Sequence, residues 1–136
     1  MKKLLLLLMI LPVIGFGQKI EEKEFVDVFI SVEQMPLFGD CKDQECTQTE
    51  IMKFISRNFK YPKIAKENGV EGRVYVEFVI EKCGHVDRVK IVNGLSAEID
   101  KEAIKVIRLL PKFQPGIQFG EPAPVKFITH VKCSLG

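Results

Sequence analysis

An alternation of hydrophobic and polar positions marks the clearest elements of the chain, two strands with a short turn between them. From Gly72 to Ile80, apolar residues occupy every second position. A period of two is typical of a strand with one buried face. Residues 82–85 predict a turn, in which Gly84 can adopt a positive φ. The apolar positions of residues 86–92 change phase once, which predicts a second strand with a β-bulge.

The alternation returns at the C-terminal end, in residues 125–133. Four prolines between residues 111 and 124 predict a stiff, extended connector before this strand, in place of a tight turn. A strand that is reached through a long connector can lie at the edge of a sheet. One face of this strand carries Val125, Phe127, Thr129, Val131 and Cys133, and the other carries Lys126, Ile128, His130 and Lys132.

A period near 3.6 residues predicts two amphipathic helices. Thr47 followed by Glu50 is a capping-box pattern that predicts the start of the first helix, and the residue before Pro62 ends it. A short helix then covers residues 63–68, and a glycine closes it. The second amphipathic helix ends at Pro111. The apolar positions are Ile51, Phe54, Ile55 and Phe59 in the first helix and Ile99, Ala103, Val106, Ile107 and Leu110 in the second.

An earlier stretch, residues 25–32, is rich in β-formers and predicts one more strand. The order of elements is therefore strand, helix, short helix, hairpin, helix, connector and strand. A hairpin and one returning strand, with helices over one face of the sheet, make an α+β fold.

The N-terminal residues predict export. Lys2 and Lys3 precede an apolar run of 13 residues, 4–16, and small residues lie just ahead of a cut before Gln18. A membrane-spanning helix needs about 20 apolar residues. We therefore interpret residues 1–17 as a cleaved signal peptide and expect a periplasmic protein. The alternative is a retained, tilted anchor in the inner membrane.

The signal peptide changes the charge of the mature chain. Residues 1–17 contain two of the 20 basic residues and none of the 18 acidic ones, so 18 of each remain. Because nucleic-acid binding requires clustered Lys and Arg, a neutral chain without a basic run predicts no nucleic-acid partner. We divide the rest of the chain into an N-terminal segment, 18–48, and one domain, 49–136.

The four cysteines favour a disulfide over a metal site. Cys41 and Cys46 enclose four residues, and in an exported chain this pair predicts a disulfide. Cys83 and Cys133 are far apart in sequence, and their pairing stays open. A zinc site built from Cys41, Cys46, Cys83 and His85 would lack the usual ligand spacing. We therefore expect no metal and no other cofactor.

The chain offers little for catalysis. His85 and His130 are the two histidines. His85 follows Cys83 within a turn, where the contact between a nucleophile and its base is hard to hold. No glycine pattern for phosphate or dinucleotide binding occurs. We expect a protein that is not an enzyme and has no small-molecule substrate.

Six short motifs follow one another along the second half of the chain: YP-x-x-A at 61–65, G-V-x-G-x-V at 69–74, G-x-V at 84–86, I-D-x-E-A at 99–103, L-P-K-F-x-P-G at 110–116 and G-x-P at 120–122. In this order and spacing they resemble the TonB C-terminal domain family. Upstream, V-E-Q-M-P-L-F at 32–38 is similar to the pre-domain segment of TonB-like proteins of the Bacteroidetes type. Phe113 stands where the family usually carries Trp.

The resemblance implies a three-stranded antiparallel sheet packed against two helices, here with an extra N-terminal strand and helix. In the family, this domain binds the TonB box and the plug of outer-membrane transporters. An edge strand exposes N–H and C=O groups to an incoming peptide, so the last strand is the expected contact. The expected contact residues are Val125, Lys126, Phe127, Ile128, Thr129, His130 and Val131.

Two alternatives to transporter binding involve the same strand. Its edge can be occupied by the chain itself. The protein can also be a scaffold that keeps the fold without a transport role, and it can form a homodimer through its last strand.

A full TonB also has a membrane anchor and a long proline-rich spacer. Here 31 residues, which are not rich in proline, precede residue 49 after the signal peptide, and they span at most ~100 Å.

Overall fold

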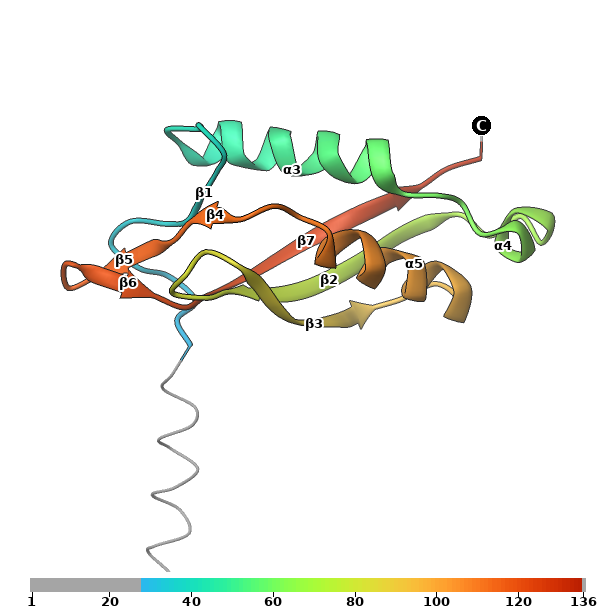
Figure 1. Ribbon diagram of the computed structural model, residues 1–136. Coiled ribbons are helices and arrows are strands. Elements are labelled where there is room, and N and C mark those ends of the chain that lie inside the picture. The colour runs from blue at the N-terminus through green and yellow to red at the C-terminus, as the bar shows by residue number, and fades with distance from the viewer. Residues whose placement is uncertain (1–27, 136) are drawn as a thin grey trace, which may run out of the picture.

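The computed structural model describes residues 28–135. In chain order, its elements are β1 (Leu37–Phe38), α3 (Gln44–Asn58), α4 (Lys63–Glu67), β2 (Gly72–Ile80), β3 (Val86–Asn93), α5 (Ala97–Arg108), β4 (Phe113–Gln114), β5 (Gly116–Gln118), β6 (Glu121–Ala123) and β7 (Val125–Cys133). The main sheet has the strand order β3–β2–β7, and both pairings are antiparallel. Figure 1 shows this sheet with the short strands gathered at one end.

The hydrophobic core lies between one face of the main sheet and the helices. The even-numbered side chains of β2, from Val74 to Ile80, are buried, and so are the odd-numbered side chains of β7. Helix α3 adds Ile51 and Ile55 to this cluster, α4 adds Ala65, and α5 adds four more residues. The helices therefore cover the same face of the sheet. This arrangement confirms the predicted α+β fold with a three-stranded antiparallel sheet.

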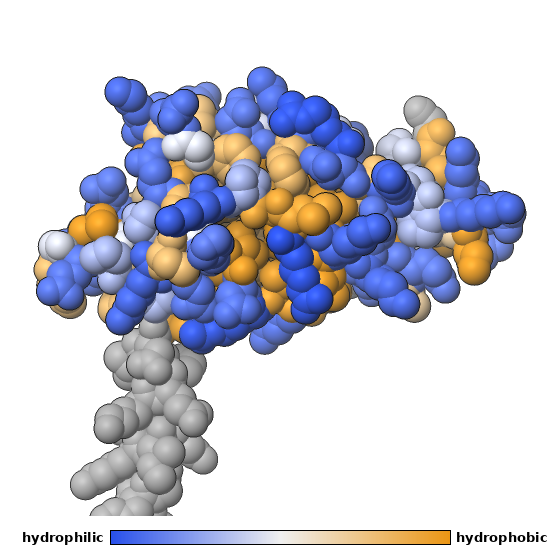
Figure 2. All heavy atoms as spheres, viewed as in Figure 1, coloured by the Kyte–Doolittle hydropathy of each residue, from blue (hydrophilic) through white to orange (hydrophobic). Residues whose placement is uncertain are grey.

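Aromatic rings fix the last strand to this core. The ring of Phe127 lies 5.8 Å from that of Phe78 and 6.4 Å from that of Phe113, measured between centroids. Figure 2 shows apolar side chains in the middle of the helix side, beneath α3 and next to α5, with hydrophilic side chains around them. Because Phe127 has aromatic neighbours on two elements, β7 is anchored through its buried face.

Helix α3 begins earlier than the capping-box pattern predicts. Its N-cap is Asp43, whose side chain accepts a hydrogen bond from the main-chain N–H of Cys46 (2.8 Å). Thr47 is buried inside the helix, where its Oγ1 accepts a hydrogen bond from the N–H of Phe38 (3.1 Å). The prediction of Thr47 as N-cap is wrong, because its hydroxyl binds another segment and the upstream Asp caps the helix.

The N-terminal strand is shorter and later than predicted. The described part of residues 25–32 is not a strand, and residues 25–27 lie outside the described range. Phe29 instead forms an isolated parallel bridge with Val125. The first strand of the described chain is β1, which pairs with β4. This N-terminal segment thus meets the start of β7 and then turns away from it.

The second strand of the hairpin, β3, is irregular as predicted. Its pairing with β2 shifts register between Tyr75 and Val76 and again between Glu77 and Val79. Arg88 lies opposite the second shift and has a φ of 50°, which is a left-handed conformation. These shifts confirm the predicted β-bulge and add a further irregularity.

The connector before β7 holds more structure than the four prolines predict. It contains β4 and a small hairpin in which β5 and β6 pair from Gly116–Ala123 to Gln118–Glu121. Pro122 is accommodated because its strand has a partner on one side only in the described structure, so its missing N–H disturbs no ladder there. The connector is therefore a folded segment that links the α3 side of the molecule to β7.

The predicted disulfide is present between Cys41 and Cys46, with Cα atoms 5.5 Å apart. Cys83 is exposed and Cys133 is buried, and both are free thiols. They do not pair with each other. Within residues 28–135, no helix is both long and apolar enough to cross a membrane. The predicted signal peptide lies outside that range.

Candidate protein-interaction edge

Strand β7 forms one edge of the main sheet. It pairs with β2 over its whole length without a register shift, from Gly72 opposite Cys133 to Ile80 opposite Val125. The order β3–β2–β7 places β2 in the centre, so β7 has a strand partner on one side only among residues 28–135. β-Branched and aromatic residues on the buried face of β7 favour an extended strand, in keeping with its uninterrupted pairing.

The N-terminal segment occupies the first part of the outer edge of β7. The N–H of Phe29 donates to the carbonyl of Pro124 (3.0 Å), and the N–H of Lys126 donates to the carbonyl of Phe29 (2.8 Å). The main-chain groups of Lys126 therefore point away from β2. Because these directions alternate along a strand, the N–H and C=O groups of Ile128, His130 and Lys132 also point outward.

No other segment of the described chain pairs with this outer edge. Within residues 28–135, the chain thus covers the edge at Phe29 and leaves it free beyond Lys126. Ile128 and Lys132 are exposed, whereas His130 is half-buried. The free edge, which we define as Ile128–Lys132, is the part of β7 that can accept another strand.

The seven residues predicted from the sequence divide into two groups. The side chains of Val125, Phe127, Thr129 and Val131 are buried in the core, and by the same alternation their main-chain groups bond to β2. Lys126, Ile128 and His130 lie on the other face, as the sequence pattern predicts. The first group holds β7 in place, and the second group is accessible to a partner.

The sequence prediction missed two residues of this edge. Lys132 continues the alternation of Ile128 and His130, so the pattern could have identified it. Phe29 closes the start of the edge through a bridge to a residue nearly one hundred positions away. No local signal in the sequence marks such a contact.

Side chains next to the free edge form a polar and aromatic row. The rings of Tyr75 and His130 lie 6.0 Å apart. Oε2 of Glu77 is 3.6 Å from Nζ of Lys90 and 3.9 Å from Nζ of Lys126. These ion pairs are partly exposed, so we expect each to contribute less than about 1 kcal/mol. The row lies on the face of the sheet opposite the helices.

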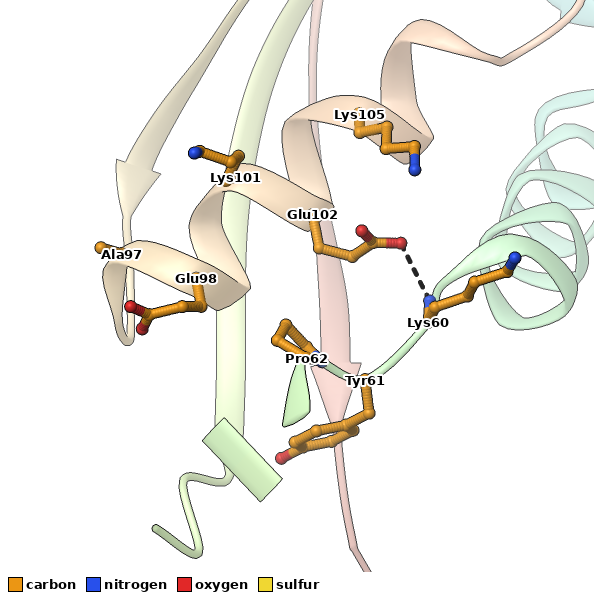
Figure 3. A pocket seen from close by; sticks show the side chains of 8 residues that line it. All are labelled: Lys60, Tyr61, Pro62, Ala97, Glu98, Lys101, Glu102 and Lys105. Atoms are coloured by element: carbon orange, nitrogen blue, oxygen red, sulfur yellow. Dashed lines mark hydrogen bonds between the residues drawn. The ribbon is translucent and has the colours of Figure 1, made fainter. Parts of the chain in front are cut away.

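A groove of about 480 Å³ lies between α5 and the segment that joins α3 to α4. Figure 3 shows Glu102 of α5 pointing toward the main chain of Lys60, whose N–H donates to Oε2 of Glu102 (3.0 Å). The hydroxyl of Tyr61 donates to the carbonyl of Val70. Burial raises the pKa of Tyr61, and nearby acidic groups add to the effect. These contacts make the groove a structural junction that ties α5 to the YP motif.

The described chain shows no cluster of three or more His, Cys, Asp and Glu residues that could hold a metal ion. The zinc alternative is wrong in its proposed ligands, because Cys41 and Cys46 are joined in a disulfide. Burial raises the pKa of the Cys133 thiol, and the carboxylate of Asp100 adds to the effect. Cys133 therefore stays protonated and is a core residue at the end of β7.

An open antiparallel sheet with helices on one face and one regular free edge defines a domain suited to strand addition. The chain belongs to the family of Gram-negative bacterial TonB protein C-terminal domains, whose model matches residues 57–133. This match covers every element from α4 to β7. It confirms the family that the sequence motifs indicated.

Solved structures of TonB C-terminal domains are similar to this chain. The NMR structure of the Helicobacter pylori TonB C-terminal domain is 27% identical, covers 63% of this chain and 90% of its own, and has a TM-score of 0.49. The NMR structure of the Pseudomonas aeruginosa TonB C-terminal domain is 18% identical, covers 80% and 95%, and has a TM-score of 0.44. No match was found among curated protein sequences.

Proposed function

We propose that this protein binds outer-membrane TonB-dependent transporters in the periplasm, through the TonB box or the plug, by adding a transporter strand to β7. The observation that carries the proposal is the free edge Ile128–Lys132, with its outward main-chain groups. Domains of this family generally interact with such transporters.

Main-chain hydrogen bonds would supply the affinity of strand addition, and side chains at alternate positions would supply its selectivity. The edge sets a limit on the length of the added strand, because Phe29 already bonds to Lys126 and Pro124. A transporter segment would therefore pair from Ile128 toward the C-terminal end of β7. Peptides that pair only with the covered part of the edge would not bind.

The role in energy-coupled transport depends on the N-terminus. Domains of this family are periplasmic in general. If residues 1–17 are removed as a signal peptide, the protein cannot itself transmit force from the inner membrane. It would then act as a soluble partner of a transporter or of another TonB-like protein. N-terminal sequencing of the exported protein should begin at Gln18, and an intact Met1 would restore the anchored alternative.

Isothermal titration calorimetry tests the binding proposal. Protein purified after export is titrated with TonB-box peptides, and with the same peptides N-methylated at alternate residues. We expect saturable heat for the unmodified peptides and about tenfold weaker binding after methylation, since each lost hydrogen bond costs about 0.5–1.5 kcal/mol. If no TonB-box peptide gives heat, the transport proposal is wrong. The scaffold alternative would then be favoured.

The variants Ile128→Pro and Ile128→Thr separate the main chain from the side chain. Proline removes an outward N–H without breaking the ladder to β2, because Ile128 lies at an edge position. Threonine keeps the N–H and the β-branched shape. We expect Ile128→Pro to weaken peptide binding about tenfold or more, and Ile128→Thr to change it much less. Equal losses in both variants would contradict strand addition.

A further inference from the structure

The face of the main sheet opposite the helices, which we call the open face, gathers basic side chains that are scattered in the sequence. None of the described helices contributes to it, since α3, α4 and α5 all pack on the other face. Its side chains come from odd positions of β2, even positions of β7 and alternate positions of β3. These basic residues do not form a run in the sequence. The register of the three strands brings them together on one face.

Four basic side chains share the open face with two acidic ones, Glu77 and Asp87, and Asp87 lies opposite Val79 near the other end of β2. Glu77 is already engaged by Lys90 and Lys126. Arg73 and Lys132 lie directly opposite each other on β2 and β7. Both are exposed, and neither forms an ion pair with any residue in the range 28–135. The open face therefore carries excess positive charge at the end where Lys132 lies.

A pair of like charges directly opposite each other destabilises a sheet. Water and salt screen exposed charges, so the cost at Arg73 and Lys132 is small. A carboxylate beside Lys132 would remove that cost and gain an ion pair. The pair lies at the end of the free edge, where an added strand would place its own side chains next to Lys132.

Apolar and aromatic groups precede the basic pair along β7. Ile128 is 55% exposed, and His130 packs against Tyr75 with their rings tilted by 47°. The accessible side chains of the free edge thus change from apolar, through aromatic, to basic within four positions. Tyr and Arg at a partly apolar surface are also the residue types enriched in protein interfaces.

We propose that the open face selects which strand binds to β7: it favours a segment with an apolar residue beside Ile128 and an acidic residue, four positions away, beside Lys132. This inference rests on the proposed strand addition and names the chemistry of its partner. Side chains directly opposite each other on adjacent strands have Cβ atoms about 4.5–5.5 Å apart. Lys132 would therefore reach the carboxylate directly, and Arg73, one strand further in, would act at longer range.

A charge-reversal experiment tests this selectivity. Three TonB-box peptides, with Asp, Asn or Lys at the position beside Lys132, are titrated by calorimetry into the wild-type protein, Lys132→Glu and Arg73→Glu. Lys101→Glu on α5 is the matched control, because it makes the same change in net charge on the helix side. Each titration is repeated at low and high salt.

In the wild-type protein, we expect the Asp peptide to bind roughly two- to fivefold more tightly than the Asn peptide, which is the range for an exposed ion pair. Lys132→Glu should reverse the order of the Asp and Lys peptides. Arg73→Glu should reduce the preference less, and Lys101→Glu should leave it unchanged. High salt should weaken the preference in every case.

The outcomes separate strand addition itself from the selectivity of the open face. If all three peptides bind equally to wild type and to Lys132→Glu, strand addition stands and the open-face selectivity is overturned. If Lys101→Glu changes the preference as much as Lys132→Glu, net charge and not the open face is responsible, which also overturns it. If none of the peptides binds to any variant, strand addition fails and the selectivity fails with it.

Discussion

The two outer strands of the main sheet, β3 and β7, present different edges. The pairing of β3 with β2 shifts register twice, and Arg88 takes a left-handed conformation at one of the shifts. The pairing of β7 with β2 is continuous over nine residue pairs. Bulges bend and twist an edge strand, which hinders the approach of another strand. The irregular β3 edge is therefore poorly suited to pairing with another strand, whereas the regular β7 edge is well suited to it.

The same comparison explains why β7 can remain exposed without losing its place. Five of its nine side chains are buried in the core, alternating with accessible ones. In β3, by contrast, Val86, Val89 and Ile91 are only partly buried. A strand that is to accept a partner on its edge must be held firmly from its face. The contacts of Phe127 with Phe78 and Phe113 hold β7 from its buried face.

The largest loss of stability should come from removing the core contacts that anchor β7. Phe127→Ala removes a buried ring between Phe78 and Phe113, and we expect the free energy of unfolding to fall by about 3–5 kcal/mol. Val89→Ala, a smaller truncation in β3, should cost about 1 kcal/mol because the side chain is only partly buried. Urea denaturation of both variants measures the difference. Equal losses would contradict the idea that β7 is the more firmly anchored edge.

A smaller effect should follow from uncovering the start of β7. Phe29→Pro removes the N–H that donates to Pro124, and we expect a loss of about 1 kcal/mol in the free energy of unfolding. It should also free the N–H of Lys126 for a partner. Peptides extended by two residues should then gain affinity over shorter ones, as measured by calorimetry.

Phe29→Ala is the control for this change, because it keeps the main-chain donor and loses the ring. It should give no advantage to the longer peptides. If both variants, or neither, extend the usable edge, the bridge at Phe29 does not define where the free edge begins.

The smallest effect on stability at neutral pH is expected from Cys133, at the C-terminal end of β7. Burial raises the pKa of Cys133 above its ordinary value of 9.0, so the folded state keeps a proton that the unfolded state loses. The contribution of Cys133 to stability is therefore fully present below pH 9.0 and is lost as the pH rises through the raised pKa. Denaturation curves at several pH values should show a steeper alkaline loss for wild type than for Cys133→Ala.

Tyr61 should add to the alkaline loss at somewhat higher pH, since burial raises its pKa above 10.0. Its hydroxyl donates to Val70 in the folded state, and ionisation would remove that donor. Tyr61→Phe should therefore flatten the remaining pH dependence. An unchanged alkaline slope in both variants would show that neither burial effect contributes.

Patterns within one element were predicted well. The alternation in residues 125–133 placed every side chain of β7 on the correct face, and the phase change in residues 86–92 predicted the irregular β3. The short spacing of Cys41 and Cys46 predicted their disulfide. These signals are local, because side-chain direction in a strand and closure of a short loop depend on near neighbours in sequence.

Patterns that depend on distant partners were not predicted. The capping box at Thr47 looked complete, but its hydroxyl binds Phe38 and Asp43 caps α3. The prolines before β7 predicted an extended connector, but this segment contains the hairpin of β5 and β6. A residue that satisfies a local rule can still be used elsewhere when a tertiary contact is stronger, and the sequence does not reveal which contact is formed.

The sequence by itself determined the family, the α+β fold and the two faces of the last strand, since periodicity and motif order are written along the chain. Only the tertiary structure decided that β2 is central, that Phe29 covers the first part of the β7 edge, and that Ile128–Lys132 pairs with no other strand of the described chain. It also decided that Arg73 and Lys132 face each other. Pairing and register join residues far apart in sequence, so they are fixed by packing of the whole domain and not by any local pattern.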